Sequence, residues 1–94
     1  MYLIYRTKTF EKSYSRLKRS GINGKVVTEI ENVIDLLSSG EPIDSVFRDH
    51  KLNGEYEGYR ECHIRTDLLL IYRLQEDKIV LALIDIGSHS YLFE

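Results

Sequence analysis

Apolar residues recur along the chain with two different spacings, and the change of spacing separates a helical part from a strand-rich part. Phe10, Tyr14 and Leu17 follow one another at steps of four and three residues, which is the spacing of one helix face. Thr9 is a suitable N-cap for this segment, and Gly21 ends it. The pattern predicts an amphipathic helix between these two residues.

The next stripe is the most regular in the chain: Val26, Val27, Ile30, Val33, Ile34 and Leu37. It predicts a second helix that begins at Asn23 or Gly24 and ends at Gly40 and Pro42. Two helices joined by the few residues around Gly21 should form an antiparallel hairpin whose apolar side packs on a sheet.

The other apolar segments have the length and composition of strands. Residues 2–5 predict a first strand, and residues 58–64, 68–74 and 78–86 predict three more after a polar connector at 43–57. The links between the last three are too short for a parallel crossover, so these strands form antiparallel hairpins. Segment 68–74 is nearly all apolar, as in a central strand covered on both faces. Two connector residues are expected to be buried anchors: Val46 and Phe47.

These elements predict an α+β fold, with the helix hairpin on one face of an antiparallel sheet, candidate catalytic residues on the other face, and a short C-terminal tail. The composition is that of a folded domain, with 94 residues, 43% hydrophobic and 30% charged, so we expect one domain spanning residues 1–94. Apolar runs fall short of the roughly 18 residues that a membrane span needs, and a lone Cys62 cannot form an internal disulfide. We therefore expect a soluble cytoplasmic protein with no membrane association.

Charge is distributed unevenly, although the net charge is only −2. Residues 1–25 carry seven Lys/Arg against one acid, whereas residues 26–47 carry five acids and no Lys/Arg. Any polyanion should therefore meet the first helix, whose basic residues are Lys12, Arg16, Lys18 and Arg19. The same charges are also compatible with a solvated helix face that has no partner.

The three histidines, His50, His63 and His89, lie in or beside the strand-rich half, where active sites tend to be placed. In strand 58–64 the side chains alternate, so that Arg60 and Cys62 oppose Glu61 and His63. Spacings typical of a zinc site, a serine or cysteine nucleophile, or a phosphate-binding glycine loop are absent. Metal-free acid–base chemistry on histidine remains.

Four short segments then carry a resemblance. They are Asp-His-Lys-Leu at 49–52, Gly-Tyr-Arg-Glu-Cys-His at 58–63, Asp-Leu-Leu-Leu-Ile-Tyr at 67–72, and Gly-Ser-His at 87–89 with Leu-Phe at 92–93. In this order and spacing they resemble the YafQ family of bacterial toxins, within the RelE/ParE superfamily. The preceding strand and helix hairpin agree with that family's RelE-like topology.

The resemblance implies a ribosome-dependent messenger-RNA endonuclease of a type II toxin-antitoxin system that needs no cofactor or metal. It also implies a hetero-oligomer with a cognate antitoxin whose DNA-binding part is of the ribbon-helix-helix or a similar type. The family's catalytic positions match these residues: His50, His63, Asp67 and His89, with Phe93 near the substrate bases. Glu61 stands where relatives can carry aspartate, and Thr66 where relatives often have proline.

The residues themselves suit that reaction. Cleavage of RNA without metal needs a base for the 2′-hydroxyl, an acid for the leaving 5′-oxygen, and positive charge on the phosphate between them. Three histidines and Arg60 can supply this set, and Asp67 can orient one imidazole. We expect substrate contacts from Arg60, Glu61 and Phe93, although Phe93 could equally pack against the helix pair. The basic first helix is expected to contact ribosomal RNA.

Two alternatives stay open at this point. One is a ParE-like relative without nuclease chemistry that acts by binding a protein such as gyrase. The other is a non-enzymatic RNA-binding or structural domain in which the histidines have no catalytic role.

Overall fold

The first helix begins at a threonine that joins it to the sheet. The computed structural model describes residues 1–93 and places α1 at Lys8–Arg19. Thr7 Oγ1 accepts the Phe10 N–H at 3.2 Å and donates to the Leu83 carbonyl at 2.8 Å. The expected cap at Thr9 was therefore wrong by two residues, because the cap position also makes a tertiary hydrogen bond that the local pattern does not reveal.

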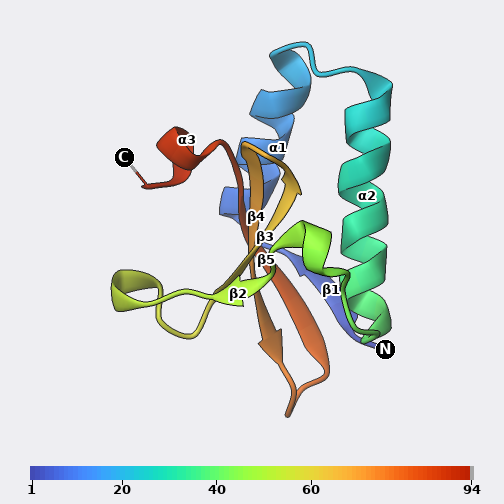
Figure 1. The fold of residues 1–94 in the computed structure, drawn as a ribbon, viewed down its shortest axis with the longest axis vertical. Helices are drawn as coiled ribbons and strands as arrows, with labels where there is room; N and C mark the ends of the chain where they lie inside the picture. Colours follow the sequence, from blue (N-terminus) through green and yellow to red (C-terminus); the bar gives the residue numbers. More distant parts are fainter. Residues whose placement is uncertain (94) are drawn as a thin grey trace.

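The second helix follows its apolar stripe closely. Helix α2 spans Gly24–Ser39, with the Asn23 side chain accepting the Val26 N–H at 3.0 Å. It ends at Gly40, whose φ of 79° lies in the left-handed region that glycine adopts without strain. The two helices form the expected hairpin, and they stand side by side in Figure 1.

Five strands form one sheet in the order β1-β5-β4-β3-β2. Their bounds are β1 Leu3–Arg6, β2 His50–Lys51, β3 Arg60–Arg65, β4 Leu68–Gln75 and β5 Val80–Gly87. Strands β3, β4 and β5 are antiparallel neighbours, as expected. Strand β2 adds an antiparallel pairing with β3 that was not expected, and β1 pairs with β5 in parallel. The length of the connecting links could not predict how β1 and β5 pair, because both helices and the other strands lie between them in the chain.

The polar connector contains more structure than its sequence suggests. It holds the two-residue strand β2 and two short 3₁₀ turns, η1 (Ser45–Phe47) and η2 (Gly54–Tyr56). Phe47 packs partly buried against the core, as expected. Val46 does not, since it is 70% exposed. The prediction for Val46 was wrong because η1 is a single turn that can present only part of its surface to the sheet.

Two apolar clusters cover the two faces of the sheet. We call the face under α1 and α2 the helix face, and its cluster includes Phe10, Ile30, Ile34, Cys62, Leu70 and Leu83. We call the opposite side the site face, and its smaller cluster includes Leu69, Ile71 and Leu92. Strand β4 contributes to both clusters, which explains its almost continuous apolar sequence.

The C-terminal tail is a short helix, α3 (His89–Phe93), that returns over the site face, on the other side of the sheet from α2 (Figure 1). Tyr91 Oη lies 2.9 Å from Ser13 Oγ of α1. Gly87 permits this approach, since a Cβ there would lie 2.5 Å from the Tyr91 ring. No helix within residues 1–93 is long and apolar enough to cross a membrane.

Candidate active site

The pairing of β2 with β3 brings two histidines to one carboxylate. His50 is the cross-strand partner of Glu61, and His63 lies two residues further along β3 on the same face. Glu61 Oε1 is 3.2 Å from His63 Nε2 and 3.5 Å from His50 Nε2. The two imidazole rings have centroids 6.2 Å apart. The site face therefore carries a compact His50–Glu61–His63 cluster.

Backbone carbonyls fix the orientation of both rings. His50 Nδ1 lies 2.7 Å from the Arg48 carbonyl, and His63 Nδ1 lies 3.4 Å from the Thr66 carbonyl. Because a carbonyl can only accept, each Nδ1 is the donor in its contact, and each Nε2 is directed toward Glu61. The Glu61 side chain is 6% exposed and that of His63 14%, whereas that of His50 is 50% exposed. The cluster is thus anchored inside and open to solvent on its His50 side.

A second group of predicted site residues gathers at the start of α3. Asp67 lies in the turn between β3 and β4, and its Oδ1 accepts the backbone N–H of His89 at 2.9 Å. Phe93 lies one helical turn further, with its ring centroid 5.1 Å from that of His89. The carboxylate of Asp67 therefore fixes where α3 begins and with it the position of His89.

A wall of tyrosines completes this group, and the sequence interpretation missed it. The Tyr56 and Phe93 rings meet edge to face, with their centroids 5.3 Å apart. The Tyr59 ring is tilted against the Tyr56 ring, with their centroids 6.5 Å apart. The Tyr56 hydroxyl also donates to the Leu92 carbonyl at 3.3 Å. Phe93 consequently packs on the site face and not against the helix pair. The available signal was the presence of two tyrosines and two glycines in the short segment 54–59.

The two groups border the same apolar patch. In the sheet register, Leu69 and Ile71 of β4 stand opposite His63 and Glu61 of β3, respectively. Leu92 of α3 belongs to the same apolar cluster as these two β4 residues. The site face therefore presents the imidazoles of His50 and His63 on one side of the patch and a cluster of tilted and edge-to-face aromatic rings on the other. Such rings suit the bases of a single-stranded nucleic acid.

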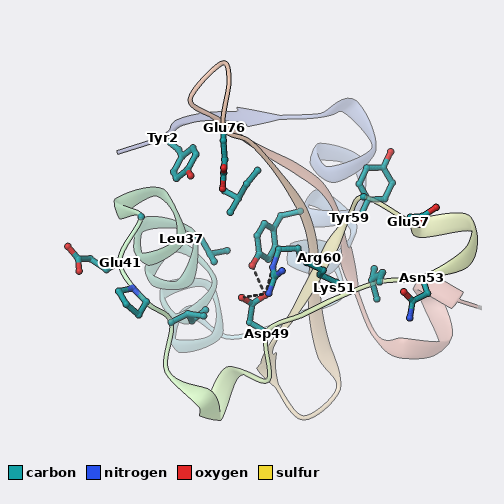
Figure 2. Close-up of a pocket in the computed structure, with 17 residues that line it drawn as sticks. Tyr2, Leu37, Glu41, Asp49, Lys51, Asn53, Glu57, Tyr59, Arg60 and Glu76 are labelled. Carbon is teal, nitrogen blue, oxygen red and sulfur yellow. Dashed lines mark hydrogen bonds and ion pairs between the residues drawn. The ribbon is translucent and has the colours of Figure 1, made fainter.

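Arg60 is not part of this arrangement. It faces the helix side of β3, where its Nε and Nη2 donate to Asp49 at 3.4 and 3.2 Å (Figure 2). The alternation of side chains along a strand places it opposite Glu61 and His63. The structure thus brings together all the predicted site residues except Arg60 and the basic residues of α1.

The four basic residues of α1 that were expected to contact RNA divide into two sets. Three of them, Lys12, Arg16 and Arg19, line a shallow pocket together with Tyr91 of α3. The Arg16 guanidinium lies 4.3 Å from the centre of the Tyr91 ring. Lys18 instead lies 4.1 Å from the centre of the Tyr14 ring. We call the first set the basic stripe, because it follows one face of α1 next to the helix that carries His89.

Cysteine-based nucleophilic chemistry finds little support in the geometry. Burial, together with the negative charges of Asp49 and Glu61, raises the pKa of the Cys62 thiol to about 12, so a thiolate nucleophile is not available near neutral pH. Within residues 1–93, no group of three or more His, Cys, Asp or Glu side chains has the arrangement of a metal site.

Comparison with known proteins agrees with this picture along the whole chain. A family model described as the YafQ bacterial toxin of type II toxin-antitoxin systems matches residues 2–94. The mRNA interferase toxin YafQ of Escherichia coli strain K12 is 32% identical over 93 residues, which cover 97% of this chain and 99% of that protein.

Solved structures give the same result for the fold. A metal-bound toxin from Helicobacter pylori is 34% identical, with a TM-score of 0.86 and coverage of 99% of this chain and 100% of that one. YafQ in the E. coli DinJ-YafQ toxin-antitoxin complex is 26% identical, with a TM-score of 0.85 and coverage of 99% and 98%.

Proposed function

The chain belongs to the YafQ family of bacterial toxins of type II toxin-antitoxin systems, and from this premise we propose that it is an endoribonuclease that cleaves messenger RNA and thereby stops translation. The E. coli relative that matches it from end to end is named an mRNA interferase toxin. The observation that carries the proposal is the His50–Glu61–His63 cluster, which holds two oriented imidazoles on an open sheet face.

In the proposed reaction the 2′-hydroxyl of a ribose attacks the neighbouring phosphate while a base takes its proton. The 5′-oxygen then leaves with a proton from an acid. Imidazole suits both steps near neutral pH, and His50, His63 and His89 are the groups available. Glu61 orients the first two, Asp67 positions the third, and Phe93 with Tyr56 stacks against a splayed base.

Positive charge for the phosphate comes from another arginine than the one expected. Side chains of β4 alternate, with Leu69 and Ile71 on the site face and Leu70 and Tyr72 on the helix face, so Arg73 continues the site-face row. The Arg73 side chain is exposed. The residue lies two positions, or roughly 7 Å, along the strand from Ile71. Ile71 is the cross-strand partner of Glu61. We therefore assign the electrostatic role to Arg73 in place of Arg60.

The ribosome supplies what this chain lacks for binding RNA. A protein with a net charge of −2 has weak general attraction for a polyanion. The basic stripe belongs to the segment 1–25, which has seven Lys/Arg against one acid, and it lies beside α3. Contact between the stripe and ribosomal RNA would direct the site face toward a message held in the decoding site, so that positioning becomes part of catalysis.

A cognate antitoxin is the second partner. The E. coli relative has been crystallised in a complex with the antitoxin DinJ. An endoribonuclease acting on every translated message must be masked, so we propose a toxin–antitoxin hetero-oligomer in the cytoplasm, where the ribosomes are. A ParE-like function without nuclease chemistry is not favoured, because the three histidines lie on the site face and the match is to YafQ toxins.

The direct test is a cleavage assay with purified protein. Messenger RNA is presented either free or on programmed ribosomes, and cut sites are mapped by primer extension under single-turnover conditions. We expect cleavage within the decoding site only when ribosomes are present. Equal cleavage of free RNA would contradict the ribosome requirement, and no cleavage in either case would contradict the nuclease proposal.

A further inference from the structure

A partly buried polar cluster lies directly behind the site face, on the helix face of β3. Asp49 Oδ1 accepts the Tyr72 hydroxyl at 2.5 Å, and the two Asp49 oxygens accept Arg60 Nε and Nη2 at 3.4 and 3.2 Å (Figure 2). Tyr72 is 1% exposed, and the Asp49 and Arg60 side chains are 14% and 29% exposed. We call this set of three residues the Asp49 clamp.

Each member of the clamp neighbours a part of the site. Asp49 immediately precedes His50, and Arg60 immediately precedes Glu61. Tyr72 is the cross-strand partner of Arg60. The clamp therefore ties the start of β2 to β3 and β4 from behind, while the imidazole of His50 meets Glu61 in front.

Strand β2 needs such a tie, because its backbone does little to hold it. It has two residues, lies at the edge of the sheet, and pairs with Arg60 and Glu61 of β3. One further backbone hydrogen bond, from the Leu52 N–H to the Tyr59 carbonyl at 2.9 Å, extends this pairing. The residue two before His50, Arg48, has a φ of 51°, in the left-handed region that side chains other than glycine rarely adopt. A short edge strand after a strained turn frays easily unless a side chain anchors it.

The hydrogen-bond donors of the Asp49 clamp stay protonated across the physiological pH range. Burial, reinforced by the hydrogen bond to Asp49, raises the pKa of Tyr72 far above its usual value, so its hydroxyl remains a donor at any physiological pH. Arginine keeps its charge, and within residues 1–93 no buried side-chain nitrogen or oxygen lacks a partner. The carboxylate of Asp49 is thus held by donors on two strands that do not titrate.

We propose that Asp49, Arg60 and Tyr72 are positioning residues that hold β2 against β3 so that His50 Nε2 is directed at Glu61 and the substrate. This inference rests on the catalytic role of His50 proposed above. It also gives a role to Arg60, which the sequence suggested for substrate contact and which the structure places behind the site.

The test compares two matched tyrosine variants. Tyr72→Phe removes the hydroxyl of the clamp, whereas Tyr14→Phe removes another buried hydroxyl, which donates to Glu31 Oε2 at 2.8 Å between the two helices. On programmed ribosomes with saturating toxin, we expect Tyr72→Phe to slow the single-turnover cleavage rate about 10-fold or more, because small misplacements of catalytic groups are costly. Apparent affinity for ribosomes should stay within about two-fold, and the Tyr14→Phe control should change neither quantity.

A double-mutant cycle with His50→Ala distinguishes positioning from a general structural effect. If the clamp acts through His50, adding Tyr72→Phe to His50→Ala lowers the rate no further. The same 10-fold loss in both backgrounds would overturn the inference, and so would a folded Tyr72→Phe variant with normal cleavage. If Tyr72→Phe does not fold, Arg60→Lys serves in its place, since it keeps the charge and loses the two-pronged contact.

The result for His50→Ala alone separates this inference from the proposed function. Normal cleavage by His50→Ala would refute the catalytic assignment of His50 and the clamp's role together. Impaired cleavage by His50→Ala with additive behaviour in the cycle would refute only the clamp. NMR signals of the His50 ring that shift in Tyr72→Phe but not in Tyr14→Phe would support positioning directly.

Discussion

A carboxylate with two side-chain partners lies on each side of strand β3, Asp49 on the helix face and Glu61 on the site face, and the two clusters differ in the chemistry of those partners. On the helix face, Asp49 is held by an arginine and a tyrosine, both of which keep their protons at physiological pH. On the site face, Glu61 is held by two histidines, and the outer one is half exposed. Histidine exchanges protons near neutral pH, and solvent or substrate can reach His50. The same arrangement therefore suits stability on one side of the strand and, in the proposed reaction, acid–base chemistry on the other.

The largest effect that separates the two faces is on the chemical step. We expect His63→Ala to lower the single-turnover cleavage rate by about 10²- to 10⁴-fold, the usual loss on removing a general acid or base. His50→Ala and His89→Ala should act in the same direction. Circular dichroism and a thermal melt serve as controls, because these side chains are at the edge of the core. Folded variants of all three with near-normal rates would refute the assignment.

The second-largest effect is on stability, and here a substitution on the helix face should have a larger effect than one on the site face. Asp49→Ala leaves the Arg60 guanidinium and the buried Tyr72 hydroxyl without their acceptor, and we expect a loss of about 2–4 kcal/mol in the free energy of unfolding. Glu61→Gln should cost less, since an amide of the same length can still hydrogen-bond to the imidazole nitrogens beside it, although cleavage should fall. Urea unfolding of both variants measures the two losses in the free energy of unfolding. Equal losses would show that the two clusters contribute equally to stability.

Much of this arrangement could be predicted from the sequence, because it follows from local periodicity. The stripe and caps of α2 gave its bounds nearly to the residue, and the apolar run 68–74 indicated the central strand. Alternation along β3 placed Glu61 and His63 on one face and Arg60 on the other. The sequence interpretation nevertheless expected Arg60 to contact the substrate, although this alternation places it on the face of β3 opposite Glu61 and His63.

What the sequence could not give depends on contacts between distant segments. Strand β2 is two polar, exposed residues with no periodicity to detect, yet its register alone brings His50 to Glu61. The parallel pairing of β1 with β5 has no signature in either strand. The bond from Asp67 to the His89 backbone joins a turn to a helix that begins 22 residues later. Each of these is a tertiary contact that no short window of sequence contains.

A smaller effect is expected on ribosome binding. Reversing the three charges of the basic stripe, Lys12, Arg16 and Arg19, to glutamate should lower the salt slope of ribosome affinity by about 3, which is roughly one per phosphate contact. Lys18→Glu is a single-charge control on the same helix, because Lys18 lies over Tyr14 and does not line the pocket beside Tyr91. Equal salt slopes for the triple variant and the parent at low ionic strength would show that the stripe is a solvated surface.

The smallest effect concerns a third ion pair on β3, which belongs to neither cluster. Arg65 Nε lies 2.6 Å from Glu29 Oε1 of α2, and both side chains are substantially exposed. The hydrogen bond from Arg65 lowers the pKa of Glu29, so the pair stabilises the fold above the ordinary glutamate pKa of 4.5 and loses this contribution as the pH falls through the lowered value. Water and salt screen such a pair strongly. We therefore expect Arg65→Ala to lower the Tm only slightly at pH 7, less still in high salt, and not at all at a pH well below the lowered pKa. Cleavage on ribosomes should be unchanged, because the guanidinium is turned toward α2. A clear loss of cleavage in this variant, with the Tm preserved, would instead place Arg65 among the groups that hold the RNA phosphate.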